Sequence, residues 1–271
     1  MQTFPKTKTE LSECASYFQV TGAHLYTVLH RTTAPVARVL LVGPFASERQ
    51  NSYLPWVRWA RHLAARNIEV LRFDYRGVGE SLGLFEDMTF KDWHADLQFL
   101  TDWFASRTPA LPLILHGLEM GALLAAKSFD SDLGDALLLW SPPANANLAL
   151  RSTLLRWVGL EQLLTPGAER RSASDYILQL EQGDSVEVEG YSWSPRLWRD
   201  SFLWELPFSD GQEDAASGRG RVKIVKLPKE AAPLVKGGFV GYDEVKSFDW
   251  LFEKDSEWIK AQAFNSVESQ R

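Results

Sequence analysis

Short apolar runs alternate with amphipathic stretches along the first half of the chain. The run Val36–Val42 is typical of a strand buried on both faces, and similar runs occupy residues 68–73 and 136–140 and begin at Leu113. Between them, apolar residues at helical spacing predict surface helices over 53–66 and 89–106. This alternation predicts an α/β fold, with a mostly parallel sheet covered by helices on both faces and joined by right-handed crossovers.

Both ends of the chain carry further predicted elements. Residues 17–20 and 25–30 alternate around Thr21 and Gly22, which predicts a hairpin. Residues 221–227 alternate with lysines, as expected of a strand near a sheet edge. We interpret 244–252 as the last strand and 253–264 as a closing amphipathic helix.

The middle of the chain breaks this pattern. Residues 144–206 lack strand alternation and are rich in leucine, arginine and tryptophan (Trp157, Trp193, Trp198, Trp204). We predict a helical cap at 144–206, inserted between an N-terminal core part at 1–143 and a C-terminal core part at 207–271. Aromatic residues at this density are more often core than ligand-lining, although both interpretations remain open.

The stretch from Leu113 to Lys127 passes from an apolar run through two glycines into a helix-forming sequence. Its spacing, Gly117-x-Glu119-x-Gly121, is that of a strand–turn–helix elbow that holds one side chain above a sheet. In such sheets the ligand crevice lies at the carboxyl ends of the strands. We therefore expect the turns that begin at Gly43, Asp74, Gly117 and Ser141 to border one pocket.

These features resemble the α/β-hydrolase superfamily, in its serine aminopeptidase and esterase-like branch. The resemblance rests on the elbow, on the turn Asp74–Ser81 and on the order of the strands. More narrowly, four segments are similar to exosortase A system-associated hydrolases of bacterial exopolysaccharide clusters: 43–48, the elbow with its helix, 136–142 and 183–195. The resemblance implies a capped α/β-hydrolase fold, and a structural role for the Asp74–Ser81 turn, which recurs regardless of activity.

Acyl transfer on this fold needs an elbow nucleophile, then an acid, then a histidine, in that chain order. Here the elbow carries Glu119, and all of the five histidines precede it: His24, His30, His62, His94 and His116. Two of the three triad members are therefore absent. The resemblance places the N–H groups of Phe45 and Met120 where an oxyanion hole would be, so the Glu119 carboxylate would occupy that hole.

Each candidate residue has a bland and a chemical interpretation. For Glu119, at the first turn of a helix, a structural or ligand-binding role is favoured over attack, because glutamate is one methylene longer than the aspartate nucleophile known on this fold. His116 is more often a packed residue than a base, yet it is the best remaining acid/base candidate. Ser141 faces the same crevice and has no adjacent base, so binding is favoured over attack.

Composition narrows the partners. The net charge of −6 with mixed signs argues against a nucleic-acid surface. The single cysteine, Cys14, excludes an internal disulfide and fits a cytoplasmic protein. We expect no export signal, no membrane span, no metal site and no cofactor, because no run or cluster has the required pattern.

Two functions remain from different classes. The first is a pseudoenzyme: a degenerate hydrolase-fold protein that binds a small apolar or amphipathic ligand, or a protein partner, in a bacterial envelope or exopolysaccharide pathway. The second is an active hydrolase of esters, thioesters or peptides that uses an unconventional site such as Glu119 with His116. The missing downstream histidine favours the first.

Overall fold

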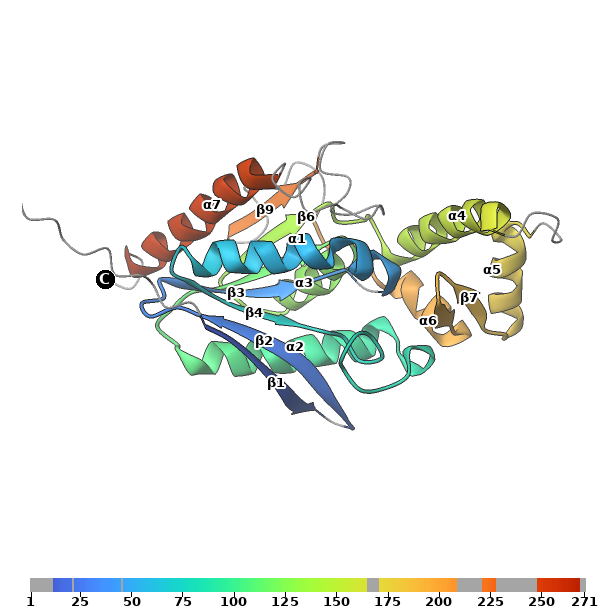
Figure 1. The fold of residues 1–271 in the computed structure, drawn as a ribbon, viewed down its shortest axis with the longest axis horizontal. Helices are drawn as coiled ribbons and strands as arrows, with labels where there is room; N and C mark the ends of the chain where they lie inside the picture. Colours follow the sequence, from blue (N-terminus) through green and yellow to red (C-terminus); the bar gives the residue numbers. More distant parts are fainter. Residues whose placement is uncertain are drawn as a thin grey trace, which may run out of the picture.

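A twisted sheet of seven strands, in the order β1-β2-β4-β3-β5-β6-β9, forms the centre of the computed structural model (Figure 1). The structure describes residues 12–20, 22–44, 46–164, 171–208, 221–227 and 248–268. The strands of this sheet are β1 (Ser12–Val20), β2 (Ala23–Arg31), β3 (Ala37–Val42), β4 (Ile68–Phe73), β5 (Leu113–Leu118), β6 (Ala136–Trp140) and β9 (Arg221–Val225).

The direction of the strands divides the sheet into two parts. β1 and β2 form an antiparallel hairpin, and β2 is antiparallel to β4. From β4 to β9 every neighbouring pair is parallel. Every residue of β3, β5 and β6 is buried, which is why these strands read as continuous apolar runs. The predicted hairpin, the mostly parallel sheet and the edge position of β9 among the described strands are thus confirmed.

Helices cover both faces of the sheet. α1 (Ala46–Ala64) and α7 (Asp249–Glu268) pack on one face, where Trp59, Leu63, Leu251 and Phe252 share a core with the strands. α2 (Phe90–Arg107) and α3 (Met120–Asp130) pack on the other. Figure 1 shows α1 and α7 above the sheet and α2 below it.

The predicted last strand is wrong in its described part. Asp249 to Phe252 form the first turn of α7, and Phe248 precedes it as a short 3-10 turn. Leu251, Phe252 and Ile259 recur at helical spacing and are almost fully buried against the sheet. Residues 244–247 lie outside the described part of the chain.

A buried ion pair fixes α7 to the sheet. The Asp255 carboxylate is fully buried and accepts hydrogen bonds from Trp140 Nε1 and Lys223 Nζ, both at 2.6 Å. Trp140 ends β6 and Lys223 belongs to β9. One carboxylate therefore ties the closing helix to two neighbouring strands at the edge of the sheet.

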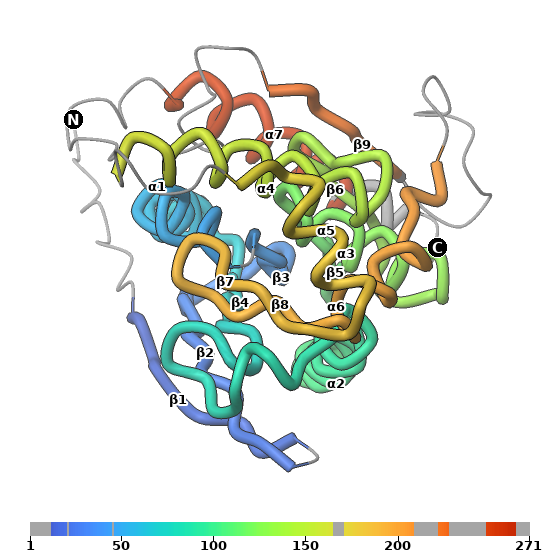
Figure 2. Tube along the Cα trace, turned by 90° about the vertical axis from the view of Figure 1, so that its right-hand side faces the viewer, coloured from blue at the N-terminus to red at the C-terminus, as the bar shows by residue number. Residues whose placement is uncertain are grey.

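Residues 144–206 form an excursion beyond the carboxyl ends of the parallel strands (Figures 1 and 2). Their described part holds α4 (Ala146–Leu164), α5 (Ala173–Gln182), β7 (Val186–Val188), β8 (Tyr191–Trp193), α6 (Pro195–Asp200) and the 3-10 turn η2 (Ser201–Leu203). The entry and exit of this segment pair with each other: Ala146 N donates to Trp204 O at 2.8 Å, and Leu206 N to Ala144 O at 2.9 Å. We call residues 144–206 the α4–α6 segment.

The hairpin of β7 and β8 is an element that the sequence analysis missed. Its two turn residues, Glu189 and Gly190, both have positive φ, at 50° and 82°. That conformation at both central positions is typical of the two-residue turns that match the twist of a hairpin. The alternating residues from Val186 to Trp193 around Gly190 carried the signal. Trp193, Trp198 and Trp204 are buried, which agrees with the core interpretation of the tryptophans.

Candidate functional site

The turn between β5 and α3 holds Glu119 in a strained conformation. Its backbone has φ 51° and ψ −123°, a combination that residues with a side chain rarely adopt. Glu119 N donates to Trp140 O at 3.0 Å, and Glu119 O accepts from Ala122 N at 2.9 Å. The carbonyl of the neighbouring strand and the first turn of α3 therefore hold the residue from both sides.

The two glycines beside Glu119 make this turn sterically feasible. A Cβ on Gly117 would lie 2.4 Å from Ala122 Cα. A Cβ on Gly121 would lie 2.2 Å from the carbonyl oxygens of both Val42 and Gly43. The helix thus starts in direct backbone contact with the end of β3. This contact fixes where Glu119 points relative to the loop that follows β3.

A cavity of about 280 Å³ opens at this turn, between the strand ends and α4. It brings together three of the residues that the sequence analysis singled out, namely Glu119, Met120 and Ser141. Phe45, the fourth, lies outside the described residues. The remaining lining residues are Pro44, Glu48, Pro142, Pro143, Leu148, Ala149, Leu150, Ser152, Thr153, Arg156 and Trp193. Trp193 is the one of the four tryptophans of the α4–α6 segment that belongs to this described lining.

Ser141 is a second strained residue in the wall of the cavity. Its φ is 45°, and its N donates to Val225 O at 2.8 Å. Its Oγ accepts a hydrogen bond from Leu227 N at 3.1 Å. Because a hydroxyl carries one hydrogen as well as its acceptor lone pairs, Ser141 keeps a donor for a bound molecule. The contact with Leu227 gives this hydroxyl a positioning task as well.

A polar network joins α1 to the α4–α6 segment at the rim of the cavity. Thr153 Oγ1 and Arg156 donate to the same Glu48 oxygen, Oε1, at 2.8 and 3.0 Å. Arg156 also forms a two-pronged pair with Glu189, through Nε at 2.9 Å and a terminal nitrogen at 3.0 Å. Burial alone would lower the pKa of Arg156, but the bonds from Glu189 and the charge of Glu48 raise it overall. Arg156 therefore stays charged between two carboxylates.

Sequence reasoning missed this network because its members are far apart in the chain. Glu48 and Arg156 are separated by 108 residues, and Glu189 lies in a turn that was not predicted. The one local signal was the positive φ required at Glu189 next to Gly190. A glutamate that adopts this conformation at some cost is one whose side chain position is held by other contacts.

His116 lies away from the cavity that Glu119 lines. Its ring is fully buried under α1, with its centroid 4.6 Å from that of Trp140, 5.1 Å from that of Trp56 and 6.0 Å from that of Trp59. Its Nδ1 is 2.9 Å from the carbonyl oxygen of Leu138, so Nδ1 is the nitrogen that carries hydrogen. Burial lowers its pKa to about 3. At neutral pH this is an uncharged, packed histidine.

The other histidines are also remote from the site. All five lie within the described ranges, and none of them lines the cavity. His24 is exposed at the end of the β1–β2 hairpin. His30 and His94 have pKa values lowered to about 4, and that of His62 is also lowered, in each case chiefly by burial. The cavity therefore lacks an imidazole to act as a base.

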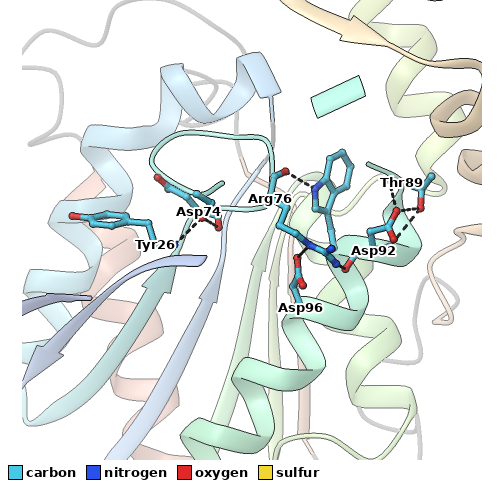
Figure 3. Close-up of polar contacts among 8 residues, drawn as sticks. Tyr26, Asp74, Arg76, Thr89, Asp92 and Asp96 are labelled. Carbon is cyan, nitrogen blue, oxygen red and sulfur yellow. Dashed lines mark hydrogen bonds and ion pairs between the residues drawn. The ribbon is translucent and has the colours of Figure 1, made fainter. Parts of the chain in front are cut away.

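The turn after β4 is held by internal bonds. Asp74 forms a two-pronged pair with Arg49, and Asp74 O accepts from Ser81 Oγ at 2.6 Å. Figure 3 shows Arg76 directed at Asp96, 2.7 Å from its Oδ2, and at the backbone of Asp92 in the first turn of α2. These contacts attach the turn to α1 and α2, as the structural interpretation of this turn predicted.

Neither a metal centre nor a membrane helix is found in the part of the chain that the structure describes. No three histidine, cysteine or acidic side chains there are grouped as metal ligands. Likewise, no described helix has the length and apolar character needed to cross a bilayer.

Comparison with known proteins agrees with this architecture. The family described as serine aminopeptidase, S33, has a sequence model that matches residues 56–179. Est1E from Butyrivibrio proteoclasticus, solved with ferulic acid bound, superposes with a TM-score of 0.60 at 16% identity, over 94% of this chain and 100% of that one. The chain has the α/β-hydrolase fold.

Two further solved structures share the α/β-hydrolase fold with this chain. A soluble variant of monoglyceride lipase from Saccharomyces cerevisiae has a TM-score of 0.59 at 15% identity, covering 96% of this chain and 99% of that one. The α/β hydrolase GrgF from Penicillium sp. sh18 has a TM-score of 0.56 at 16% identity, covering 93% and 99%. No curated protein sequence matches the chain. At these identities the likeness is one of fold.

The elbow of this α/β-hydrolase fold predicts a steric test. Replacing Gly121 by alanine places a Cβ against two carbonyl oxygens of the backbone, which cannot rotate away, so we expect a loss of about 1–3 kcal/mol or more in unfolding free energy. Gly159→Ala is the matched control. Gly159 lies inside α4 with nothing within 4 Å, so alanine there should stabilise by about 0.5–1 kcal/mol. Urea denaturation of both variants checks this, and equal stability of the two would contradict the packing of the elbow.

The buried neutral His116 predicts a loss of stability in acid. Below pH 6.5 the unfolded chain binds a proton at this histidine, whereas the folded protein does not until about pH 3. The stability present above pH 6.5 is therefore lost as the pH falls, by about 2 kcal/mol at pH 5.0 for this group. Urea denaturation at pH 7.5 and 5.0 should show a smaller loss for His116→Gln than for the parent, while the exposed His24→Gln should behave as the parent. Identical losses in all three proteins would show that His116 is solvated.

Proposed function

We propose that this protein binds a small amphipathic ligand in the cavity beside Glu119 and does not hydrolyse it. The observation that carries the proposal is the combination of a strained elbow that presents a glutamate with a cavity whose described lining includes no histidine. The elbow supports a role for the position of the Glu119 side chain. The distance of the histidines argues against proton transfer at that position.

Turnover by a covalent route needs a second group. If the Glu119 carboxylate attacked an ester, the resulting acyl-enzyme would have to be released by a water that a base activates. His30, His62, His94 and His116 all have lowered pKa values because they are buried elsewhere in the fold. An attack by Glu119 would therefore stop at the covalent ester.

The alternative function is an active hydrolase of ester, thioester or peptide bonds. The strained elbow favours it, because the same conformation presents the nucleophile in active members of this fold. His116 would have to be its base. With its Nδ1 directed at Leu138 O and its ring among three tryptophans, His116 fits a packing role better. Ligand binding is thus the better-supported function.

The α4–α6 segment serves as the cap of this binding site in our proposal. Its α4 supplies one wall of the cavity through Leu148, Ala149, Leu150 and Thr153. Its hairpin supplies Trp193. The core supplies the opposite wall through Met120 and Ser141. A ligand in this space would contact apolar side chains from both parts and a few polar groups, which is the usual composition of a small-molecule site.

The setting of this function comes from the sequence resemblance. Four segments similar to exosortase A system-associated hydrolases support an accessory role in a bacterial exopolysaccharide or envelope pathway. In that role the protein would work in the cytoplasm, with a small molecule or a protein partner.

A turnover assay tests the proposal. The purified protein should hydrolyse nitrophenyl butyrate, an aminoacyl nitroanilide and an acyl thioester no faster than Glu119→Gln does, because no base lies at the cavity. Glu187→Gln is the matched control, since Glu187 is exposed on β7 and does not line the site. A rate well above the buffer blank that Glu119→Gln abolishes and Glu187→Gln retains would overturn the proposal.

A further inference from the structure

We propose that the ligand is a small organic monocation, whose ammonium group lies between the carboxylates of Glu48 and Glu119. This inference rests on the proposed binding function and gives the ligand a chemical class. Glu48 begins α1, whereas Glu119 ends the turn after β5, and both line the same cavity. Glu48 was not a candidate in the sequence.

The geometry of Glu48 supports a role in contacting the ligand. Two donors, Thr153 Oγ1 and Arg156, converge on its Oε1 and fix the orientation of the carboxylate. Its side chain is 14% exposed, so it lies mostly within the protein. Among the described residues, no hydrogen bond is made to its other oxygen, Oε2. A carboxylate held in this way has an acceptor left for a donor in the cavity.

The sign of the ligand charge follows from how Arg156 is used. Arg156 is the cation of the described lining, and its guanidinium already pairs with Glu48 and, by two bonds, with Glu189. Its charge is therefore balanced before any ligand enters. With Glu119 added, the carboxylates of this group outnumber the arginine by two. An anionic ligand would be repelled, whereas a cation would be attracted over the short distances of a partly closed site.

The rest of the lining determines the shape of the ligand. Met120, Leu150 and Trp193 offer apolar surface, and the hydroxyl of Ser141 offers a further polar contact. An ammonium group has three donors, which suits two carboxylates and one hydroxyl oxygen. A metal ion fits less well, since the described residues contain no group of three ligands. The fitting molecule has one ammonium and one apolar body.

Calorimetric titration with three probes of similar size tests the inference: 2-phenylethylamine, 2-phenylethanol and 3-phenylpropionate, at pH 7 and low salt. We expect the amine to bind at least tenfold more tightly than the alcohol or the carboxylate. Glu48→Gln and Glu119→Gln should each weaken amine binding about tenfold. Glu187→Gln, the exposed control on β7, should leave it unchanged.

Other outcomes separate this inference from the function on which it rests. Equal or tighter binding of the carboxylate, an equal loss in Glu187→Gln, or no binding of the amine would overturn the ammonium assignment. If another probe binds and Ala149→Trp, which fills the cavity, abolishes that binding, the binding function stands while the ligand class is wrong. Hydrolysis that depends on Glu119 is the result that removes the function itself. Circular dichroism of each variant verifies that it is folded.

Discussion

The backbone contact between the start of α3 and the end of β3 is the constraint on which the rest of the site depends. Gly121 lies against the carbonyls of Val42 and Gly43 so closely that no side chain fits, and this contact forces Glu119 into its strained conformation. Once the turn is fixed, the ends of β3, β5 and β6 meet at one place. The cavity, with Glu119, Met120 and Ser141 in its wall, follows from that meeting.

The α/β-hydrolase fold retains this costly turn although the usual nucleophile is replaced by a glutamate. Ser141 and Glu189 also have positive φ, and both belong to the cavity wall or to the network beside it. Strain that gathers around one cavity indicates that the positions of these side chains matter. The histidines, in contrast, are used for packing: His116 is enclosed by tryptophans, and burial lowers the pKa of four of the five. Geometry for presenting a group has been kept, and the means of moving its proton are absent from the described site.

Much of the fold could be predicted from local pattern. Strands such as β3 and β6 are buried on both faces and read as apolar runs, and the glycine spacing around Glu119 identified the elbow. The prediction failed where a local pattern was ambiguous, as at Leu251 and Phe252, which could suit a strand but pack as one face of α7. The network of Glu48, Arg156 and Glu189 was beyond local reasoning. It forms across more than a hundred residues, and neither its charges nor its spacing distinguishes it from ordinary surface residues.

The central claim is that the elbow works here without a base. Intact-mass measurement of Glu119→Ser after treatment with a fluorophosphonate probe tests it most directly, because the variant restores the usual nucleophile in the same strained turn. A serine without a neighbouring base stays protonated and reacts weakly at neutral pH. The account predicts that the mass of the folded variant is unchanged by the probe. Addition of one phosphonyl group per chain, at the rate of an active serine hydrolase, would show that a base serves the elbow and would contradict the account.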